Sequence, residues 1–199
     1  MNDDGGDTLM ERHHTLHEVC IMKYTARQLF ATVILSLALP AVTVALEVGD
    51  QAPEFSLQAS DGKTYQLSDF RDKQAVVIAW FPKAYTSGCT VECKSLAENG
   101  HLIRKYDVTY FMASVDPLEA NIGFAKETGA DFPLLSDPSK KTAEAYGVLH
   151  LLGYAKRHTF YIGKDGSILK IDRQVTPATS AEDMAATLGE LGVSPTPTQ

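Results

Sequence analysis

The residue of this chain best placed to react is Cys89, which follows an apolar run and opens a helix-like segment. Backbone N–H groups at a helix start lack partners, and together with the helix dipole they stabilise an anion. A cysteine attacks as its thiolate, so this placement favours a nucleophilic role. Thr86 offers a hydroxyl within reach of the sulfur or of a bound oxygen. A helix terminus contributes only about 0.3–2 kcal/mol, so a stable thiolate also requires a cation.

Two features leave the role of Cys89 open at this level. A lone cysteine is often a small buried hydrophobic residue with no chemistry. Glu92 falls in the same first turn, where its carboxylate suits the helix dipole but opposes a thiolate. We therefore expect Glu92 either to point away as an ordinary first-turn carboxylate or to pair with a cation.

The surrounding pattern predicts an α/β domain. Apolar or alternating segments predict strands at 55–58, 64–67, 75–81, 109–115, 132–135, 159–162 and 168–171. Amphipathic segments predict helices at 90–105, 118–128, 139–146 and 180–191, the last capped by Ser180. Strands that alternate with helices indicate a mainly parallel sheet covered on both faces. The order is that of a thioredoxin-like fold with an N-terminal β-hairpin and insertions.

The first 45 residues have the composition of a targeting segment. A short basic stretch begins at Met22, an apolar run covers residues 29–39, and small residues lead to Ala45. This predicts a signal peptide over 22–45, preceded by an upstream extension over 1–21. The domain is then expected at 46–194, with a disordered tail at 195–199. The protein is expected to be exported to the periplasm, with a retained membrane anchor as the alternative.

The net charge and the cysteine content limit the kinds of molecule and compartment that we expect for this protein. The formal net charge of −7 argues against nucleic acid, because phosphate binding requires a basic face. Removal of the leader takes Cys20 with it and leaves Cys89 and Cys93 in an oxidising compartment.

Several segments resemble the peroxiredoxins of the AhpC/TSA superfamily, in particular the bacterioferritin comigratory protein or peroxiredoxin Q group. The active-site loop of that group is similar to Pro82-x-x-x-Thr86-x-x-Cys89. The resemblance continues in ordered segments along residues 47–172: Gly49 to Phe55, Ser114 to Asp116, Phe132 to Asp137 and Arg157 to Gly166.

The resemblance implies a thiol-dependent peroxidase that uses no metal and no organic cofactor. Cys89 would be the peroxidatic nucleophile, which a hydroperoxide oxidises to a sulfenic acid. Thr86 would hydrogen-bond the peroxide, Pro82 would shape and shield the loop, and Arg157 would supply the cation. A thioredoxin-like protein or a small thiol would regenerate the enzyme, as a monomer or homodimer.

Cys93 departs from the group's pattern. Where that group has a nearby resolving cysteine, it lies five residues after the peroxidatic one, whereas Cys93 lies four residues after Cys89. Side chains at i and i+4 of an intact helix have Cβ atoms about 5–6 Å apart, but a disulfide needs about 3.5–4.5 Å. Cys93 is therefore a candidate resolving thiol only if the first helical turn unwinds. The alternative is direct reduction of Cys89 by an external thiol.

A second class of function also fits two spaced cysteines on such a fold. The Cys-x-x-x-Cys pair resembles the copper-delivering Sco proteins, in which two cysteines and a distant histidine bind Cu(I). His150 or His158 could be the third ligand. Against this alternative, the prolines that follow each cysteine in that family are replaced here by Thr90 and Lys94.

Overall fold

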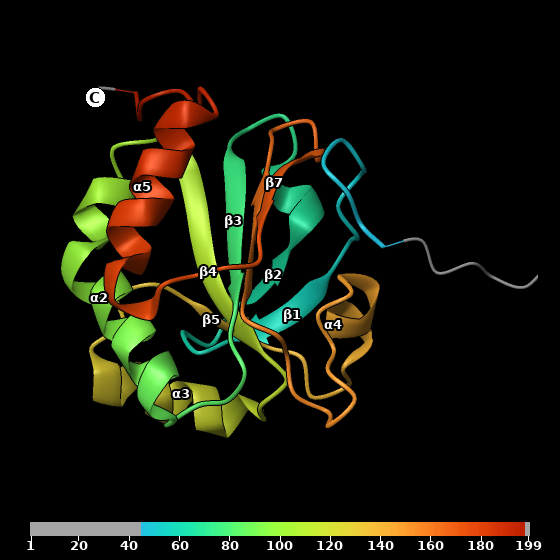
Figure 1. The fold of residues 1–199 in the computed structure, drawn as a ribbon, viewed down its shortest axis with the longest axis vertical. Helices are drawn as coiled ribbons and strands as arrows, with labels where there is room; N and C mark the ends of the chain where they lie inside the picture. The colour runs from blue at the N-terminus through green and yellow to red at the C-terminus, as the bar shows by residue number, and fades with distance from the viewer. Residues whose placement is uncertain (1–44, 198–199) are drawn as a thin grey trace, which may run out of the picture. The chain divides into compact units, whose positions relative to one another are not determined.

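The computed structural model describes residues 45–197, which form a mixed sheet with helices on both faces (Figure 1). The strands are β1 (Ser56–Ala59), β2 (Thr64–Gln66), β3 (Ala75–Trp80), β4 (Val108–Ser114), β5 (Leu134–Ser136), β6 (His158–Ile162) and β7 (Ile168–Asp172), in the order β2-β1-β5-β4-β3-β6-β7. The α-helices are α2 (Ser87–Ile103), α3 (Leu118–Thr128), α4 (Lys141–Ala145) and α5 (Ser180–Glu190), and the 3-10 helices are η1 (Leu67–Phe70) and η2 (Pro177–Thr179). The predicted α/β order is confirmed.

Strand β3 is the centre of the sheet. It runs parallel to β4 and antiparallel to β6, and every one of its residues is buried. A continuous run of apolar residues predicts a strand covered on both faces, and β3 has that environment. Because β6 is antiparallel to β3, the end of β3 and the beginning of β6 meet at the same sheet edge, where Trp80 pairs with His158.

Alternate residues of β3 enter two separate cores. Val77 and Ala79 pack with the apolar faces of α2, α3 and α5, whereas Val76 and Ile78 face α4 and η1 on the other side. Figure 1 shows the two groups of helices on opposite sides of the sheet. Helix α3 ends at Gly129, whose φ of 71° is left-handed, as the sequence predicts.

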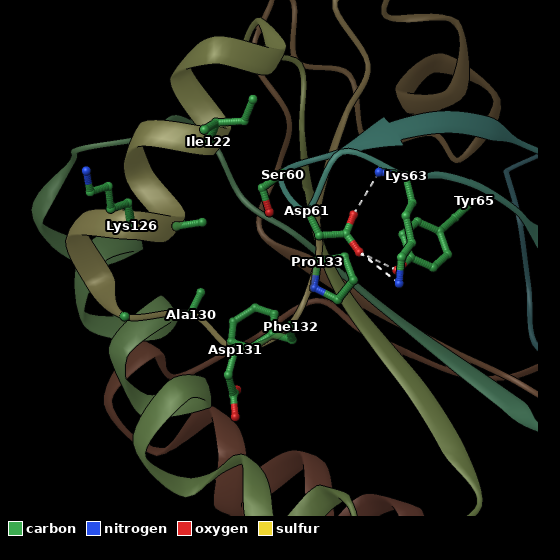
Figure 2. A pocket seen from close by; sticks show the side chains of 12 residues that line it. Ser60, Asp61, Lys63, Tyr65, Ile122, Lys126, Ala130, Asp131, Phe132 and Pro133 are labelled. Carbon is green, nitrogen blue, oxygen red and sulfur yellow. Dashed lines mark hydrogen bonds and ion pairs between the residues drawn. The ribbon is translucent and has the colours of Figure 1, made fainter.

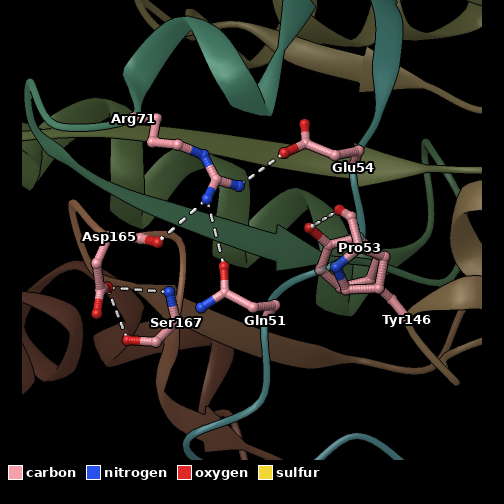
Figure 3. A network of polar contacts seen from close by, with 7 residues as sticks. All are labelled: Gln51, Pro53, Glu54, Arg71, Tyr146, Asp165 and Ser167. Carbon is pink, nitrogen blue, oxygen red and sulfur yellow. Dashed lines mark hydrogen bonds and ion pairs between the residues drawn. The ribbon is translucent and has the colours of Figure 1, made fainter.

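An arginine fixes the segment that leads into β1. Arg71 Nη2 donates to Glu54 Oε1 at 2.9 Å, and Arg71 Nη1 donates to the Asp165 carbonyl oxygen at 3.3 Å (Figure 3). Tyr146 donates its hydroxyl to the Pro53 carbonyl oxygen at 2.8 Å. These hydrogen bonds join segments that lie far apart in the sequence.

Helix α2 begins earlier than predicted. The sequence places its start at Thr90, whereas the structure places it at Ser87, with Thr86 as the extended N-cap residue at φ −81° and ψ 149°. The Thr90 amide donates to the Thr86 carbonyl at 2.9 Å and closes the first turn. Because Gly88 has a low helix propensity, the sequence did not indicate that the helix begins before Cys89. Cys89 therefore lies inside the first turn.

Two details near the C-terminus also differ from prediction. Thr179, rather than Ser180, is the N-cap of α5, and its hydroxyl donates to Asp183 Oδ2 at 2.7 Å. The beginning of the predicted disordered tail is ordered: Pro195 forms a bridge with Tyr106, and the Thr196 amide donates to the Lys105 carbonyl at 2.9 Å. These backbone bonds fix residues that composition alone marks as disordered.

The predicted extension over 1–21 and nearly all of the predicted signal peptide over 22–45 lie outside the described residues. Within residues 45–197, no helix has both the length and the apolar character to cross a membrane.

Candidate active site

Cys89 is fully buried in the first turn of α2. The turn follows the loop that leaves the end of β3, so the central strand fixes its position. The helix start directs its unpaired N–H groups at this turn, which is the environment that stabilises an anionic sulfur. The predicted placement at a helix start is confirmed, and the later helical turns then pack against the core.

Arg157 supplies the cation beside the sulfur. Its Nη2 donates to Cys89 Sγ at 3.2 Å, and its Nη1 donates to Glu92 Oε2. Arg157 directly precedes β6, so the β3–β6 pairing brings it to the cysteine. Glu92 is completely buried and forms an ion pair with Arg157, which is the second of the two arrangements expected for this carboxylate. One guanidinium thus joins both groups.

Gly88 has a role that the sequence does not indicate. A Cβ atom at this position would lie 3.3 Å from Arg157 Nη2. A side chain here would require the guanidinium to shift by a few tenths of an ångström from its hydrogen bonds to Cys89 and Glu92. The absence of a side chain at Gly88 therefore allows Arg157 to reach the sulfur. The family resemblance pointed to Arg157, but nothing in the sequence indicated that Gly88 leaves room for it.

The loop before α2 is fastened to the segment from β4 to α3. Asp116 Oδ2 accepts a hydrogen bond from the Ala84 amide at 2.9 Å. Tyr85 adopts a left-handed φ of 64°, which is uncommon for an aromatic residue. Its ring packs edge-on against Phe124 at 5.3 Å, and its hydroxyl donates to the Ala120 carbonyl at 3.2 Å. These contacts hold a strained loop in place, and sequence reasoning assigned no role to Tyr85.

The other two loop residues of the predicted site lie near Cys89 in the chain and make no hydrogen bond with it. Thr86 donates its hydroxyl to the Lys83 carbonyl at 2.9 Å, so its proton is engaged and its lone pairs remain able to accept. Pro82 is half-buried directly after Phe81, whose ring packs against Phe124 at 5.8 Å.

Cys93 is buried one turn further along α2 and faces α3. Its Sγ lies 3.1 Å from Thr128 Oγ1, and both cysteines are free thiols. Burial raises the pKa of Cys93 to about 11, and the nearby Cys89 adds to this while the Thr128 hydrogen bond opposes it. A thiol with so high a pKa is almost wholly protonated at neutral pH.

The two histidines of the copper alternative have other partners. His158 begins β6 and pairs with Trp80. Burial lowers the pKa of His158, and the positive charges of Arg173 and Lys156 lower it further. His150 lies in the loop before β6 and stacks on Tyr154 at 4.6 Å. Within residues 45–197, no three cysteine, histidine or carboxylate side chains gather as a metal site would require.

A hollow of about 750 Å³ lies away from the cysteine (Figure 2). It is enclosed by the β1–β2 turn, α3 and the segment before β5, with Asp61, Lys126 and Phe132 among its lining residues. Cys89, Thr86 and Arg157 do not line it. We therefore assign the reactive centre to the Cys89 turn, where the polar groups converge.

A buried cysteine in the first turn of a helix, contacted by an arginine that directly precedes the neighbouring strand β6, places the chain among thioredoxin-like proteins with a cation-paired thiol. The family model for the AhpC/TSA family matches residues 48–171. The chain belongs to the AhpC/TSA family.

Individual relatives agree with this assignment. The chain is 30% identical to peroxiredoxin Bcp of Bacillus subtilis over 153 residues, which cover 73% of this chain and 97% of the relative. It is 39% identical to peroxiredoxin Bcp of Escherichia coli over 103 residues, 52% of this chain, and the match spans 65% of that relative's length. The crystal structure of peroxidoxin BcpB from Mycobacterium tuberculosis superposes with a TM-score of 0.67 at 29% identity, covering 73% of this chain and 97% of that one. The predicted fold and family are confirmed, and the Sco alternative is not supported.

Proposed function

We propose that the protein is a thiol-dependent peroxidase that reduces hydrogen peroxide or organic hydroperoxides at Cys89. The observation that carries this proposal is the 3.2 Å contact between Arg157 Nη2 and Cys89 Sγ in the first turn of α2. Membership of the AhpC/TSA family and the likeness to relatives named peroxiredoxin support it.

In the first step, the Cys89 thiolate attacks the outer oxygen of the hydroperoxide. The S–O bond forms as the O–O bond breaks, and the alkoxide or hydroxide leaves and takes up a proton. Arg157 lies against the sulfur, where it can stabilise both the thiolate and the charge that develops on the oxygens. Thr86 Oγ1, whose own proton is donated to Lys83, can accept the proton of the hydroperoxide and orient it. Pro82 shapes the loop that shields the product.

In the second step, a thiol reduces the Cys89 sulfenic acid. Its sulfur forms a disulfide with Cys89 and water leaves, and a second thiol then releases reduced Cys89. Two thiols and one organic hydroperoxide thus give one alcohol, one water and one disulfide, and with hydrogen peroxide a second water replaces the alcohol. The reductant we propose is a thioredoxin-like protein or a small thiol, and none of these steps requires a metal or organic cofactor.

Cys93 is the candidate resolving thiol, and in the reduced protein it is held away from that role. It is buried, hydrogen-bonded to Thr128 on α3, and has a pKa raised to about 11. A Cys89–Cys93 disulfide therefore requires the first turn of α2 to unwind and Cys93 to leave Thr128. While α2 stays folded, an external thiol reduces Cys89 directly.

Peroxide consumption by wild type, Cys89→Ser and Cys93→Ser tests both parts of this proposal. We expect Cys89→Ser to lose turnover, and turnover equal to wild type would exclude the peroxidase function. Non-reducing mass analysis of oxidised wild type shows whether the Cys89–Cys93 disulfide forms. Its absence, with full turnover of Cys93→Ser, would make Cys89 the sole redox-active cysteine.

We also propose that the protein is exported to the periplasm. The basic stretch at Met22 and the apolar run over 29–39 support export, and the family match begins only at residue 48. Sequencing the N-terminus of protein from the periplasmic fraction tests this. We expect the mature chain to start near residue 46, and a start upstream of residue 40 would contradict cleavage.

A further inference from the structure

A hairpin between α4 and β6 exposes two neighbouring leucines. Leu151 is 102% exposed and Leu152 is 77% exposed, the two highest values among the large hydrophobic residues that the structure describes as exposed. Single apolar residues at a surface are ordinary, but two adjacent leucines at the tip of a turn form a protruding apolar element.

The turn holds these leucines outward. The His150 amide donates to the Tyr154 carbonyl at 2.8 Å, and the Gly153 amide donates to the His150 carbonyl at 2.8 Å. The Leu152 amide donates to His150 Nδ1 at 3.1 Å, and the His150 ring stacks on Tyr154. Gly153 has a φ of 81°, which glycine adopts without strain. The tip is preorganised, so exposing it to a partner requires no unfolding.

Two lysines lie beside this tip in an otherwise acidic chain. From Ala145 to Lys164 the sequence has no acidic residue, whereas the whole chain has a net charge of −7. Lys140 places its ammonium against Gly153, 2.8 Å from where a Cβ would stand, and Lys156 donates to the Gly147 carbonyl at 3.4 Å. Glu144 on α4 is the nearest acidic residue along the chain, and Glu92 is already paired with Arg157.

The tip belongs to the same end of the sheet as Cys89. Since Trp80 pairs with His158, the loop that follows β3 and the segment that precedes β6 leave the sheet at one edge. In Figure 1 the orange segment after α4 runs along the lower edge of the molecule. Whatever binds the tip therefore approaches the end of the domain that carries the reactive turn.

We infer that the Leu151–Leu152 tip docks the protein on the surface of an anionic lipid bilayer. Two leucines entering the acyl boundary, with lysine ammonium groups level with the headgroups, form a peripheral membrane contact. A stable protein–protein interface buries about 800 Å² on each partner, more than two leucines at a turn supply. The inference is independent of the proposed peroxidase activity.

A tryptophan at the tip reports this contact in the full chain. Trp80 is the sole tryptophan and is 1% exposed, so Leu151→Trp adds one accessible reporter. With phosphatidylglycerol-containing vesicles we expect a blue shift of its emission and loss of quenching by aqueous acrylamide. Because the readout is local to residue 151, binding by any other segment does not produce it. Pure phosphatidylcholine vesicles should give a weaker response.

Variants in the Leu151→Trp background test each component. Leu152→Ser should lower the vesicle affinity reported by the introduced tryptophan about tenfold, because one buried leucine is lost. Lys140→Glu with Lys156→Glu should remove the preference for anionic lipid. The matched control is Ile122→Trp on α3, where residue 122 is 43% exposed, and its emission should stay unchanged.

Three results would overturn the inference. One is equal acrylamide quenching with and without vesicles. Another is an Ile122→Trp response as large as that of Leu151→Trp. The third is a blue shift that rises with protein concentration in the absence of lipid, which would assign the tip to contact between two copies of the chain. Peroxide turnover measured on the same samples separates these results from failure of the proposed activity.

Discussion

Cys93 Sγ is hydrogen-bonded to Thr128 Oγ1 across the contact between α2 and α3. The two atoms lie 3.1 Å apart, and the Thr128 hydroxyl already donates to the Phe124 carbonyl at 2.7 Å. Either atom can supply the proton of the shared bond. Burial keeps Cys93 a neutral thiol at neutral pH.

Burial of the Cys93 thiol predicts a loss of stability at alkaline pH. The pKa of Cys93 rises from 9.0 to about 11 on folding, so the folded state binds the proton more tightly than the unfolded chain. The stabilisation is fully present below pH 9 and is lost as the pH approaches 11, by up to about 2–3 kcal/mol. Urea unfolding under reducing conditions at pH 8 to 11 measures it. Cys93→Ser should lose less stability over this range, and since buried tyrosines titrate in both proteins, their contribution cancels. Identical pH profiles would contradict the prediction.

The buried ion pair predicts that stability and activity can be separated. Arg157→Met leaves the fully buried Glu92 carboxylate without its partner, and we expect a loss of about 3 kcal/mol in the free energy of unfolding. Adding Glu92→Gln should restore most of that stability, because the unpaired charge is gone. Peroxide reduction should remain at least tenfold slower in both variants, because the cation beside Cys89 is missing. Recovery of activity in the double variant would show that Arg157 acts only through the fold.

Gly88→Ala should slow the reaction without weakening the fold. The new methyl group would stand 3.3 Å from Arg157 Nη2 and push the guanidinium away from the sulfur. Alanine in place of glycine within a helix otherwise stabilises it by about 1 kcal/mol. We expect a several-fold lower rate of peroxide reduction by stopped-flow, with an unchanged or higher urea midpoint. Ser87→Ala, on the exposed neighbouring position, is the matched control. An unaltered rate in Gly88→Ala would mean that the arginine adjusts freely.

Gly123→Ala tests the fastening of the loop to α3. A Cβ at this position would lie within van der Waals overlap of the Tyr85 hydroxyl, so the half-exposed ring must swing outward. The loop then loses its bond to the Ala120 carbonyl. We expect slower peroxide reduction with less than about 1 kcal/mol of lost stability, because the displaced ring moves into solvent. Tyr85→Phe, which removes the hydroxyl alone, should have a smaller effect. The prediction fails if Gly123→Ala reacts at the wild-type rate.

The sequence was sufficient to predict the sheet and the position of Cys89, because apolar runs such as Ala75–Phe81 are strong local signals. It also indicated the need for a cation and, through the family resemblance, which arginine to test. Local patterns could not reveal that one guanidinium contacts both Cys89 and Glu92, because that geometry depends on the pairing of β3 with β6. The start of α2 was predicted three residues late, because Gly88 has a low helix propensity. A glycine stands there because Arg157 Nη2 comes close to its backbone. The order of Thr196 could not be predicted, because its backbone partner, Lys105, lies far away in the sequence.

The two parts of the site, Cys89 and Arg157, come from segments that lie far apart in the sequence and meet only when the sheet forms. Arg157 reaches Cys89 only after β6 has docked on β3, so a nascent chain carries the cysteine without its cation. Before that pairing the thiol lacks the positive charge that would stabilise its thiolate. Formation of the site is therefore coupled to the pairing of β3 with β6, and the appearance of peroxide reactivity during refolding should coincide with that pairing.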